Sequence, residues 1–252
     1  MCFHEGSHCG MSFRSVTIAC IGRFLYNEVG IRSRRQEILM MKRRDELLMK
    51  TLFLSSSGLN ESTSDVFWKC IKKEPADTKV IYVPSAAVEN DGAREGIALC
   101  AEGLMNMGIP FENILIYELS LLISADYERT YSGHVKNIPL PLRLMSVEEL
   151  NQYDVIVFGG GDAARLLNEV RRTGFYDPLK QAIENGLVYL GISAGSMIAA
   201  GNFSNGLGYL TNQIIPHAEE GTPCGEVPSD KPIKTADGQV IVIQGDRKEI
   251  IC

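Results

Sequence analysis

The sequence predicts an α/β fold in which a mostly parallel β-sheet is covered by helices on both faces. From residue 51 onward, short apolar runs alternate with segments whose apolar residues recur at helical spacing. The run at 79–85 is continuously apolar, as expected of a strand that is buried on both faces. Glycine-containing turns follow the apolar runs at 154–161 and 187–193, and ligands of such folds bind at the carboxyl ends of the strands.

Composition and charge limit the classes of function. The chain has 252 residues, of which 45% are hydrophobic and 22% are charged, which is typical of a soluble globular protein with a sizeable core. The net charge of -6 argues against a nucleic-acid or anionic-membrane partner, because both require a surplus of Lys and Arg. No apolar stretch approaches the roughly 20 residues that span a bilayer. We therefore expect a cytoplasmic protein that acts on a small molecule or a peptide.

Residues 1–48 differ in pattern from the rest of the chain. They are weakly periodic and end in a charge-dense segment, whereas Met49 and Lys50 open the β-type run MKTLFLSSSG. We expect residues 49–252 to form a single domain and residues 1–48 to be a non-native or poorly packed extension. A secretory signal is the competing interpretation, but the apolar run after Arg14 is short and Arg23 interrupts its continuation.

The cysteines predict neither a disulfide framework nor a metal site. Seven cysteines are scattered along the chain without paired CxxC spacing, which favours reduced thiols. Cys2, His4, His8 and Cys9 are competent metal ligands, but their short spacing does not match that of a zinc finger. We therefore expect no disulfide, and we disfavour a metal site at these four residues.

The first half of the domain is predicted to contain three strands and two helices. Strands are expected at 51–56, 79–85 and 113–119, and helices at 62–73 and 90–107. The inner stripe of the second helix is predicted to consist of Ile97, Leu99, Cys100, Leu104 and Met105. The segment 120–145 is less regular and contains two prolines, so we expect an insertion or a long loop there.

The second half returns to the alternating pattern. We expect a short helix at 146–150, a strand at 154–161, helices at 163–174 and 176–185, and a strand at 187–193. The C-terminal residues predict a β-hairpin with turns at Asp237-Gly238 and Gly245-Asp246.

The segment Gly191 to Gly195 has the pattern G-x-S-x-G at the point where a strand meets a helix. This context is the one required for a nucleophile elbow, in which a serine hydroxyl is exposed on a tight turn. Ser193 is the candidate nucleophile, and the amide of Ala194 is a candidate oxyanion donor. The alternative is a strand-to-helix turn with a capping serine.

A second glycine-rich turn, Gly159 to Gly161, follows the preceding predicted strand. Glycines allow the backbone to approach a ligand and to direct amide hydrogens at it, so Gly160 or Gly161 could supply the second oxyanion donor. A phosphate-binding loop is the alternative. It is disfavoured because the sequence lacks the Lys-Ser/Thr of a Walker loop, and because Asp162 would repel a phosphate.

A nucleophilic serine needs a base, and outside residues 1–48 the candidates are His134 and His217. His217 follows Pro216, which restricts the backbone just before the imidazole. It lies downstream of the serine, as the histidine does in α/β-hydrolases, so we favour His217 as the base.

These motifs together resemble the peptidase E family of serine peptidases, the alpha-aspartyl dipeptidase group related to cyanophycinase. The resemblance covers residue 49 to the C-terminus and implies a three-layer αβα sandwich similar to class I glutamine amidotransferases. It implies that Ser193 is the nucleophile, that His217 is the base, and that the substrates are short peptides such as Asp-X dipeptides. It also implies that neither a metal nor an organic cofactor is needed. The motifs that carry it are MKTLFLSSSG, VIYVPSAA, VIVFGGGDAARLL, LVYLGISAGSMIAA and IIPH.

The sequence departs from the family pattern in two places. Family members carry an acidic residue between the serine and the histidine, but this interval contains no Asp or Glu, so the third triad member is unassigned. Asparagines at 202, 205 or 212, or the glutamates at 219 and 220, could orient the imidazole, and we favour none of them. The Arg-containing segment that usually follows the histidine is also missing, so no arginine is assigned to an aspartyl substrate.

Three functions remain open at this point. The first is a serine peptidase acting through an acyl-enzyme. The second is a catalytically weak or inactive relative that serves as a binding or regulatory module. The third is a glutaminase-type amidotransferase, which is disfavoured because that chemistry uses cysteine where this chain has Ser193.

Overall fold

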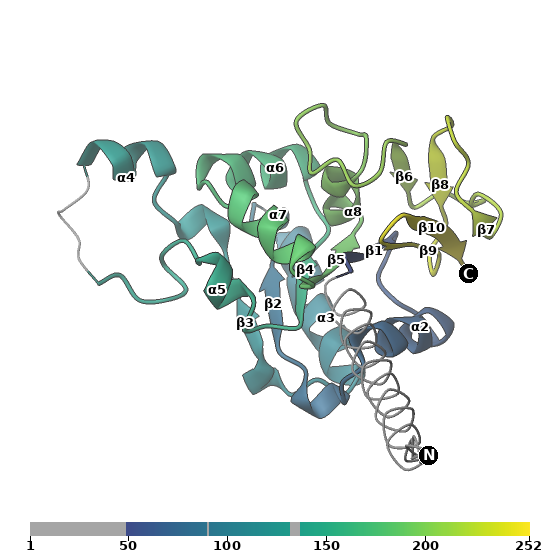
Figure 1. Ribbon diagram of the computed structural model, residues 1–252, viewed down its shortest axis with the longest axis horizontal. Helices are drawn as coiled ribbons and strands as arrows, with labels where there is room; N and C mark the ends of the chain where they lie inside the picture. The colour runs from purple at the N-terminus through teal and green to yellow at the C-terminus, as the bar shows by residue number, and fades with distance from the viewer. Residues whose placement is uncertain (1–48, 90, 132–136) are drawn as a thin grey trace, which may run out of the picture. The chain divides into compact units, whose positions relative to one another are not determined.

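The computed structural model describes residues 49–89, 91–131 and 137–252 (Figure 1). The predicted extension 1–48, the Cys2 to Cys9 metal-competent group and His134 lie outside the described residues. The described residues fall within one compact unit. The boundary at residue 49 and the nature of the extension stay predictions.

The main sheet has the strand order β3-β2-β4-β5-β1-β9-β10-β7. The first five strands in this order are mutually parallel, and β9, β10 and β7 extend the sheet in antiparallel fashion beyond β1. Its strands are β1 (Thr51–Ser55), β2 (Val80–Val83), β3 (Ile114–Ile116), β4 (Val155–Phe158), β5 (Val188–Ile192), β7 (Gly225–Glu226), β9 (Val240–Gln244) and β10 (Arg247–Ile251).

Helices cover both faces of this sheet, as Figure 1 shows. One face packs against α2 (Glu61–Ile71) and α3 (Asp91–Asn106). The other packs against α5 (Val147–Leu150), α6 (Ala163–Arg172), α7 (Tyr176–Glu184) and α8 (Ala194–Ala199). Successive strand residues supply the two cores alternately: Leu52 and Leu54 belong to the second core, and Phe53 belongs to the first. The predicted three-layer α/β fold with a mostly parallel sheet is confirmed.

A second, two-stranded sheet is formed by β6 (Ile214–Pro216) and β8 (Ile233–Thr235). The two strands are parallel, and Pro216 is opposite Thr235. The chain therefore leaves both strands at the same edge of this small sheet. His217 follows β6 directly, and the turn at Asp237-Gly238 follows β8 by one residue.

The C-terminal hairpin is confirmed at Gly245-Asp246, where β9 turns into β10. The turn at Asp237-Gly238 has a different role, because it connects β8 of the small sheet to β9 of the main sheet. Since β9 pairs antiparallel with β1, and Val240 is opposite Ser55, β9 begins at the edge where β1 ends. This turn therefore lies at the carboxyl end of the parallel strands.

The predicted inner stripe of α3 was partly wrong. Leu104 is buried, whereas Leu99 and Met105 are 59% and 44% exposed. The inner stripe instead runs through Ile97, Cys100, Leu104 and Met107, which pack against or belong to the core of that face. These positions are three or four residues apart and therefore share one face of the helix. Consecutive residues are rotated by about 100° around the helix axis, so Leu99, beside Cys100, and Met105, beside Leu104, point away from this face.

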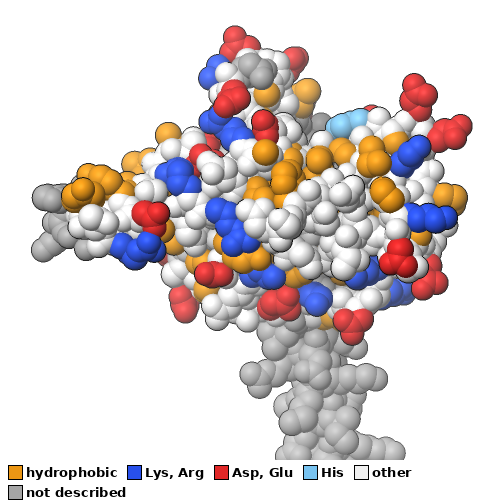
Figure 2. Space-filling view, turned by 90° about the horizontal axis from the view of Figure 1, so that it is seen from above, with side chains coloured by type: hydrophobic (Ala, Val, Ile, Leu, Met, Phe, Trp, Pro, Cys, Tyr) orange, Lys and Arg blue, Asp and Glu red, His pale blue; other side chains and the backbone are white. Residues whose placement is uncertain are grey.

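The described parts of the segment 120–145, residues 120–131 and 137–145, form an arm that the sequence predicted only as an insertion or a long loop. It contains α4 (Ala125–Tyr131), and the hydroxyl of Tyr117 anchors its return by donating to the carbonyl of Arg143. Tyr127 and Tyr131 contact one another at the exposed surface of α4. Figure 2 shows hydrophobic side chains gathered at this tip.

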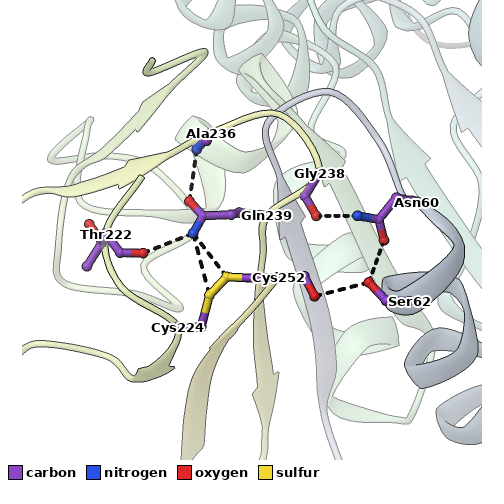
Figure 3. Close-up of a disulfide and its surroundings, with 8 residues drawn as sticks. All are labelled: Asn60, Ser62, Thr222, Cys224, Ala236, Gly238, Gln239 and Cys252. Carbon is purple, nitrogen blue, oxygen red and sulfur yellow. Dashed lines mark hydrogen bonds between the residues drawn. A yellow bond between two sulfur atoms is a disulfide. The ribbon is translucent and has the colours of Figure 1, made fainter. Parts of the chain in front are cut away.

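The expectation of no disulfide was wrong. Cys224 and Cys252 form a disulfide (Figure 3). The sequence separation of 28 residues hides the pair, because only the antiparallel pairing of β7 with β10 brings the two segments together. Among the described cysteines, Cys70 and Cys100 are free. No helix in the described ranges is long and apolar enough to cross a bilayer.

Candidate active site

Ser193 occupies the tight turn between β5 and α8. Its backbone has φ 47° and ψ -101°, a positive φ that non-glycine residues rarely adopt. Such a conformation costs about 1–3 kcal/mol and persists only where the surrounding structure enforces it. This is the geometry of a nucleophile elbow, which presents a serine hydroxyl above the end of a sheet.

Two glycines make the turn sterically possible. A Cβ atom on Gly191 would lie 2.7 Å from the carbonyl carbon of Gly195. One on Gly195 would lie 2.3 Å from the carbonyl oxygen of Phe158, at the end of β4. Both distances are too short for a methyl group. The glycines of the G-x-S-x-G pattern therefore allow β5, α8 and the neighbouring strand to approach closely around Ser193.

Buried hydroxyl groups fix this turn to the neighbouring strand β1. The Ser193 amide donates to the Ser55 carbonyl at 3.0 Å. The Ser196 hydroxyl donates to the carbonyls of Ser55 and Gly191, both at 2.8 Å. Because Ser55 and Ser196 are fully buried, these bonds are shielded from water and hold the elbow in place.

His217 faces Ser193 from the small sheet. Its Nε2 atom lies 3.1 Å from the Ser193 Oγ atom, within hydrogen-bond distance. Its backbone has φ 58°, and its amide donates to the Ser56 hydroxyl at 2.8 Å. This bond fixes the unusual backbone conformation after Pro216. The His217 side chain is 55% exposed.

Asp237 is the carboxylate that the sequence interpretation failed to assign. Its Oδ1 atom lies 3.2 Å from the Nδ1 atom of His217 and accepts a hydrogen bond from the Ser56 hydroxyl at 2.9 Å. The hydrogen bond from Ser56 is the main cause that lowers the pKa of Asp237 below 3.8, and the hydrogen bond and charge of His217 add to it. Asp237 is therefore ionised at neutral pH, as a residue that orients an imidazole and stabilises its protonated form must be.

The parallel pairing of β6 with β8 explains why His217 and Asp237 meet. Both residues follow the same edge of the small sheet, although 20 residues separate them in the sequence. The candidates predicted from the sequence lay between Ser193 and His217, where the family pattern places the acid, or directly after His217 at Glu219 and Glu220. The sequence did contain one signal, the Asp237-Gly238 turn directly before an apolar run. A strand that pairs with β1 has one end at the edge of the sheet where Ser193 lies, so a turn at that end lies near the nucleophile.

The other residues that we considered for the third position have different surroundings. Asn202 binds the backbone of Ile214 through both its amide nitrogen and its oxygen. Asn212 donates to two backbone carbonyls and is buried. Glu219 and Glu220 are exposed. The two asparagines thus position the segment that carries His217.

Of the predicted oxyanion donors, Gly160 and Gly161 line a cavity together with Ser193, and Ala194 is next to Ser193 in the chain. Gly160 is beside Ser193, since a Cβ atom on Gly160 would lie 3.6 Å from the Ser193 Cβ atom. Gly161 has φ 131° and approaches Ala86 so closely that a Cβ atom would lie 2.2 Å from the Ala86 carbonyl oxygen. Ala194 is the first residue of α8, where backbone amides have no partner within the helix. The arrangement can direct amides from two turns at one oxygen atom.

A cavity of about 460 Å³ opens at the nucleophile. Gly160, Gly161, Ser193 and His217 line its reactive end, and Leu190 and Ile192 of β5 line its floor. The remaining wall comes from α3 and from the turn after β1. Its residues are Ser56, Ser57, Gly58, Leu59, Ala93, Gly96, Leu99, Cys100, Gly103, Leu104 and Met107.

Within the part of the chain that the structure describes, no group of three or more His, Cys, Asp or Glu side chains could hold a metal ion. The polar groups that meet at Ser193 are instead a hydroxyl, an imidazole and a carboxylate. This set is suited to nucleophilic attack on a carbonyl assisted by general acid-base catalysis.

Comparisons with known proteins match this fold and this region. The model of peptidase family S51 matches residues 134–251. Peptidase E of Streptomyces coelicolor is 43% identical over 51 residues, which cover 20% of this chain and 21% of that protein. Pyridoxal 5'-phosphate synthase subunit PdxT of Pyrococcus furiosus is 42% identical over 53 residues, 21% of this chain and 27% of that protein. The chain thus matches about a quarter of the length of these curated relatives.

A solved structure extends the similarity to most of the described domain. A protein assigned as peptidase E from Listeria monocytogenes EGD-e superimposes with a TM-score of 0.52 at 20% identity, covering 81% of this chain and 98% of that one. The fold is that of the α/β proteins similar to class I glutamine amidotransferases. Residues 134–251 match the model of peptidase family S51, and the resemblance of this chain to the peptidase E family is confirmed.

Proposed function

We propose that this protein is a serine peptidase that hydrolyses short peptides through Ser193, His217 and Asp237. The observation that carries the proposal is the continuous chain of contacts from the Ser193 Oγ atom through both ring nitrogens of His217 to the Asp237 carboxylate, at 3.1 Å and 3.2 Å. The match of residues 134–251 to the model of peptidase family S51 supports the same conclusion.

The proposed reaction has two halves. His217 Nε2 takes the Ser193 proton while the hydroxyl oxygen attacks the peptide carbonyl, and the negative oxygen is stabilised by amides of Ala194 and of Gly160 or Gly161. The protonated imidazole then gives its proton to the leaving amine. Water, activated by the same imidazole, hydrolyses the acyl-enzyme and returns the hydroxyl to Ser193. Asp237 stays ionised throughout and stabilises the imidazolium.

The alternatives weighed from the sequence have less support. An inactive binding module was considered because the sequence offered no acid for the triad, and the 3.2 Å contact of Asp237 with His217 supports the active enzyme instead. A glutaminase-type amidotransferase would require a cysteine at position 193, where this chain has serine.

Hydrolysis of a mixed dipeptide library tests the proposal. Wild-type protein and Ser193→Ala, both beginning at Met49, are incubated with the library, and products are quantified by mass spectrometry. We expect free amino acids to accumulate only with the wild type. Equal product formation by both proteins, or none by either, would refute the peptidase assignment.

A further inference from the structure

The cavity beside Ser193 determines which side chains a substrate can carry. Its described lining contains no Asp, Glu, Lys or Arg side chain. The polar side chains in that lining are Ser56, Ser57, Ser193 and His217, and all lie at the reactive end or in the turn after β1. The rest of the lining is glycine or apolar, so the cavity provides an apolar surface from the nucleophile to α3.

Such a cavity discriminates against an acidic side chain. A carboxylate that enters it loses its hydration shell and meets no cation among the described lining residues. Arg165, which follows the glycine turn after β4, is already paired with Glu89. An apolar side chain gains from the same burial, because Leu190, Ile192 and Leu104 remove its surface from water.

The orientation of the substrate follows from the position of His217. The leaving amine receives its proton from His217 Nε2, and the His217 side chain is 55% exposed. The leaving group therefore departs on the solvent side of Ser193. The acyl side then faces the floor formed by Leu190, which is 2% exposed, and by Ile192.

We propose that the cavity between α3 and the sheet binds a large apolar side chain on the residue whose carbonyl Ser193 attacks. The preferred substrates are peptides with Leu, Met or Phe before the scissile bond, and Asp-X dipeptides are poor substrates. This inference rests on the proposed peptidase function and specifies the substrate class of that site.

Two glycines of α3 allow the cavity to be filled without disturbing the catalytic residues. Cβ atoms on Gly96 and on Gly103 would meet nothing within 4 Å, so larger side chains there do not collide with the backbone. Both glycines line the cavity. Ala98 is an exposed residue of the same helix that is absent from the lining, so Ala98→Leu is a matched control.

The test measures kcat/KM for fluorogenic amides that carry Ala, Leu, Phe or Asp before the scissile bond. We expect Leu and Phe to exceed both Ala and Asp by at least about tenfold, the effect expected of a well-filled apolar pocket. Gly96→Leu and Gly103→Leu should reduce the Phe/Ala ratio at least several-fold, mainly by raising KM for Phe. Ala98→Leu should retain the wild-type ratio.

Two results would overturn the inference while leaving the peptidase assignment intact. One is a preference for Asp over Leu and Phe. The other is an unchanged Phe/Ala ratio in both glycine variants, with circular dichroism showing that they are folded. Labelling of Ser193 by a small fluorophosphonate, measured in the same samples, reports on the nucleophile independently of the cavity. If Ser193 is not labelled and no amide is cleaved, the proposed function itself fails, and the substrate inference fails with it.

Discussion

At the scale of single residues, the site depends on three polar side chains from separate segments. Ser193 comes from the main sheet, His217 follows β6, and Asp237 lies in the turn between β8 and β9. Ser56, at the end of β1, connects them by donating to Asp237 and accepting from the His217 amide. Ser56 is fully buried, so it fixes the relative positions of two side chains that are themselves exposed.

Replacing Asp237 by Asn tests its role in orienting His217. The amide cannot stabilise an imidazolium and favours the wrong imidazole tautomer, so we expect kcat for peptide hydrolysis to fall by up to about 10⁴. Glu219→Gln is the control, because Glu219 is exposed and also lies in the segment after His217. Steady-state kinetics measure kcat for both variants. If Asp237→Asn behaves like Glu219→Gln, Asp237 has no part in the reaction.

The pKa of Asp237 should depend on Ser56. Because the Ser56 hydrogen bond is the largest cause of the lowered pKa, Ser56→Ala should raise it, and Ser57→Ala, the weakest contributor, should raise it less. The carboxyl carbon of Asp237 can be titrated by NMR. Because the pKa of Asp237 is lower in the folded state than its unfolded value of 3.8, the ionised carboxylate stabilises the folded state at pH values above 3.8. This stabilisation is lost as the pH falls through the folded pKa. An unchanged titration in Ser56→Ala would contradict the assignment of that cause.

Local sequence signatures identified Ser193 and the glycine turns, because a strand-to-helix turn needs small residues at fixed spacing. The Asp237-Gly238 turn was also predicted from the sequence, but its place beside His217 was not. That place depends on the pairing of β8 with β6 and of β9 with β1. Pairing between distant strands sets which loops meet, and apolar runs alone do not specify their neighbours.

At the scale of secondary-structure elements, the elbow depends on close packing of β4, β5 and α8. The two glycines flanking Ser193 leave no space for a side chain. The arm, formed by residues 120–131 and 137–145, is instead held near its base by a bidentate ion pair between Arg143 and Glu149.

Gly195→Ala tests the packing of the elbow. Its methyl group would lie 2.3 Å from the Phe158 carbonyl oxygen, so β4 or α8 must shift. We expect a loss of about 1–3 kcal/mol in the free energy of unfolding, as for other overpacked sites, together with lower kcat because Ser193 moves. Urea denaturation and steady-state kinetics measure the two effects. Gly96→Ala, in open space on α3, should instead stabilise the protein by up to about 1 kcal/mol. Equal stabilities of the two variants would contradict this account.

The ion pair at the base of the arm predicts a pH-dependent stability. The hydrogen bonds of Arg143 lower the pKa of Glu149 to about 2, from 4.5. Because the folded pKa is lowered, this stabilisation is present above about pH 4.5 and is lost as pH falls towards 2. Arg143→Met should lower the thermal midpoint at pH 6 and have little effect at pH 2. A destabilisation of equal size at both values would show that packing, and not the charge of Glu149, is responsible.

At the scale of the whole molecule, the alternating pattern of the sequence was sufficient to predict the layered α/β fold. Helix and strand periodicities alternate over residues 51–119 and 146–193, and helices on both faces are the arrangement that buries a parallel sheet. The antiparallel extension β9-β10-β7 and the small sheet were not predicted as such. These parts carry Asp237 and the disulfide, so the C-terminal segment is where sequence patterns were least informative.

The disulfide between Cys224 and Cys252 is a covalent cross-link within this C-terminal part. Cys252 is the last residue, and its carbonyl oxygen accepts a hydrogen bond from Ser62 of α2, as Figure 3 shows. We expect Cys252→Ala to lower the free energy of unfolding by about 2–5 kcal/mol under oxidising conditions. Cys70→Ala, a free cysteine, is the control. If reductant leaves the urea midpoint of the wild type unchanged, the bond does not contribute to stability.

The most direct test of the central claim is covalent labelling of the nucleophile. Wild-type protein, Ser193→Ala and Asp237→Asn are treated with a fluorophosphonate, and the modified residue is identified by tandem mass spectrometry. The triad predicts that wild-type protein is labelled on Ser193, that Asp237→Asn is labelled much more slowly, and that Ser193→Ala is not labelled. Absence of modification in the wild type, or modification of a residue other than Ser193, would contradict it.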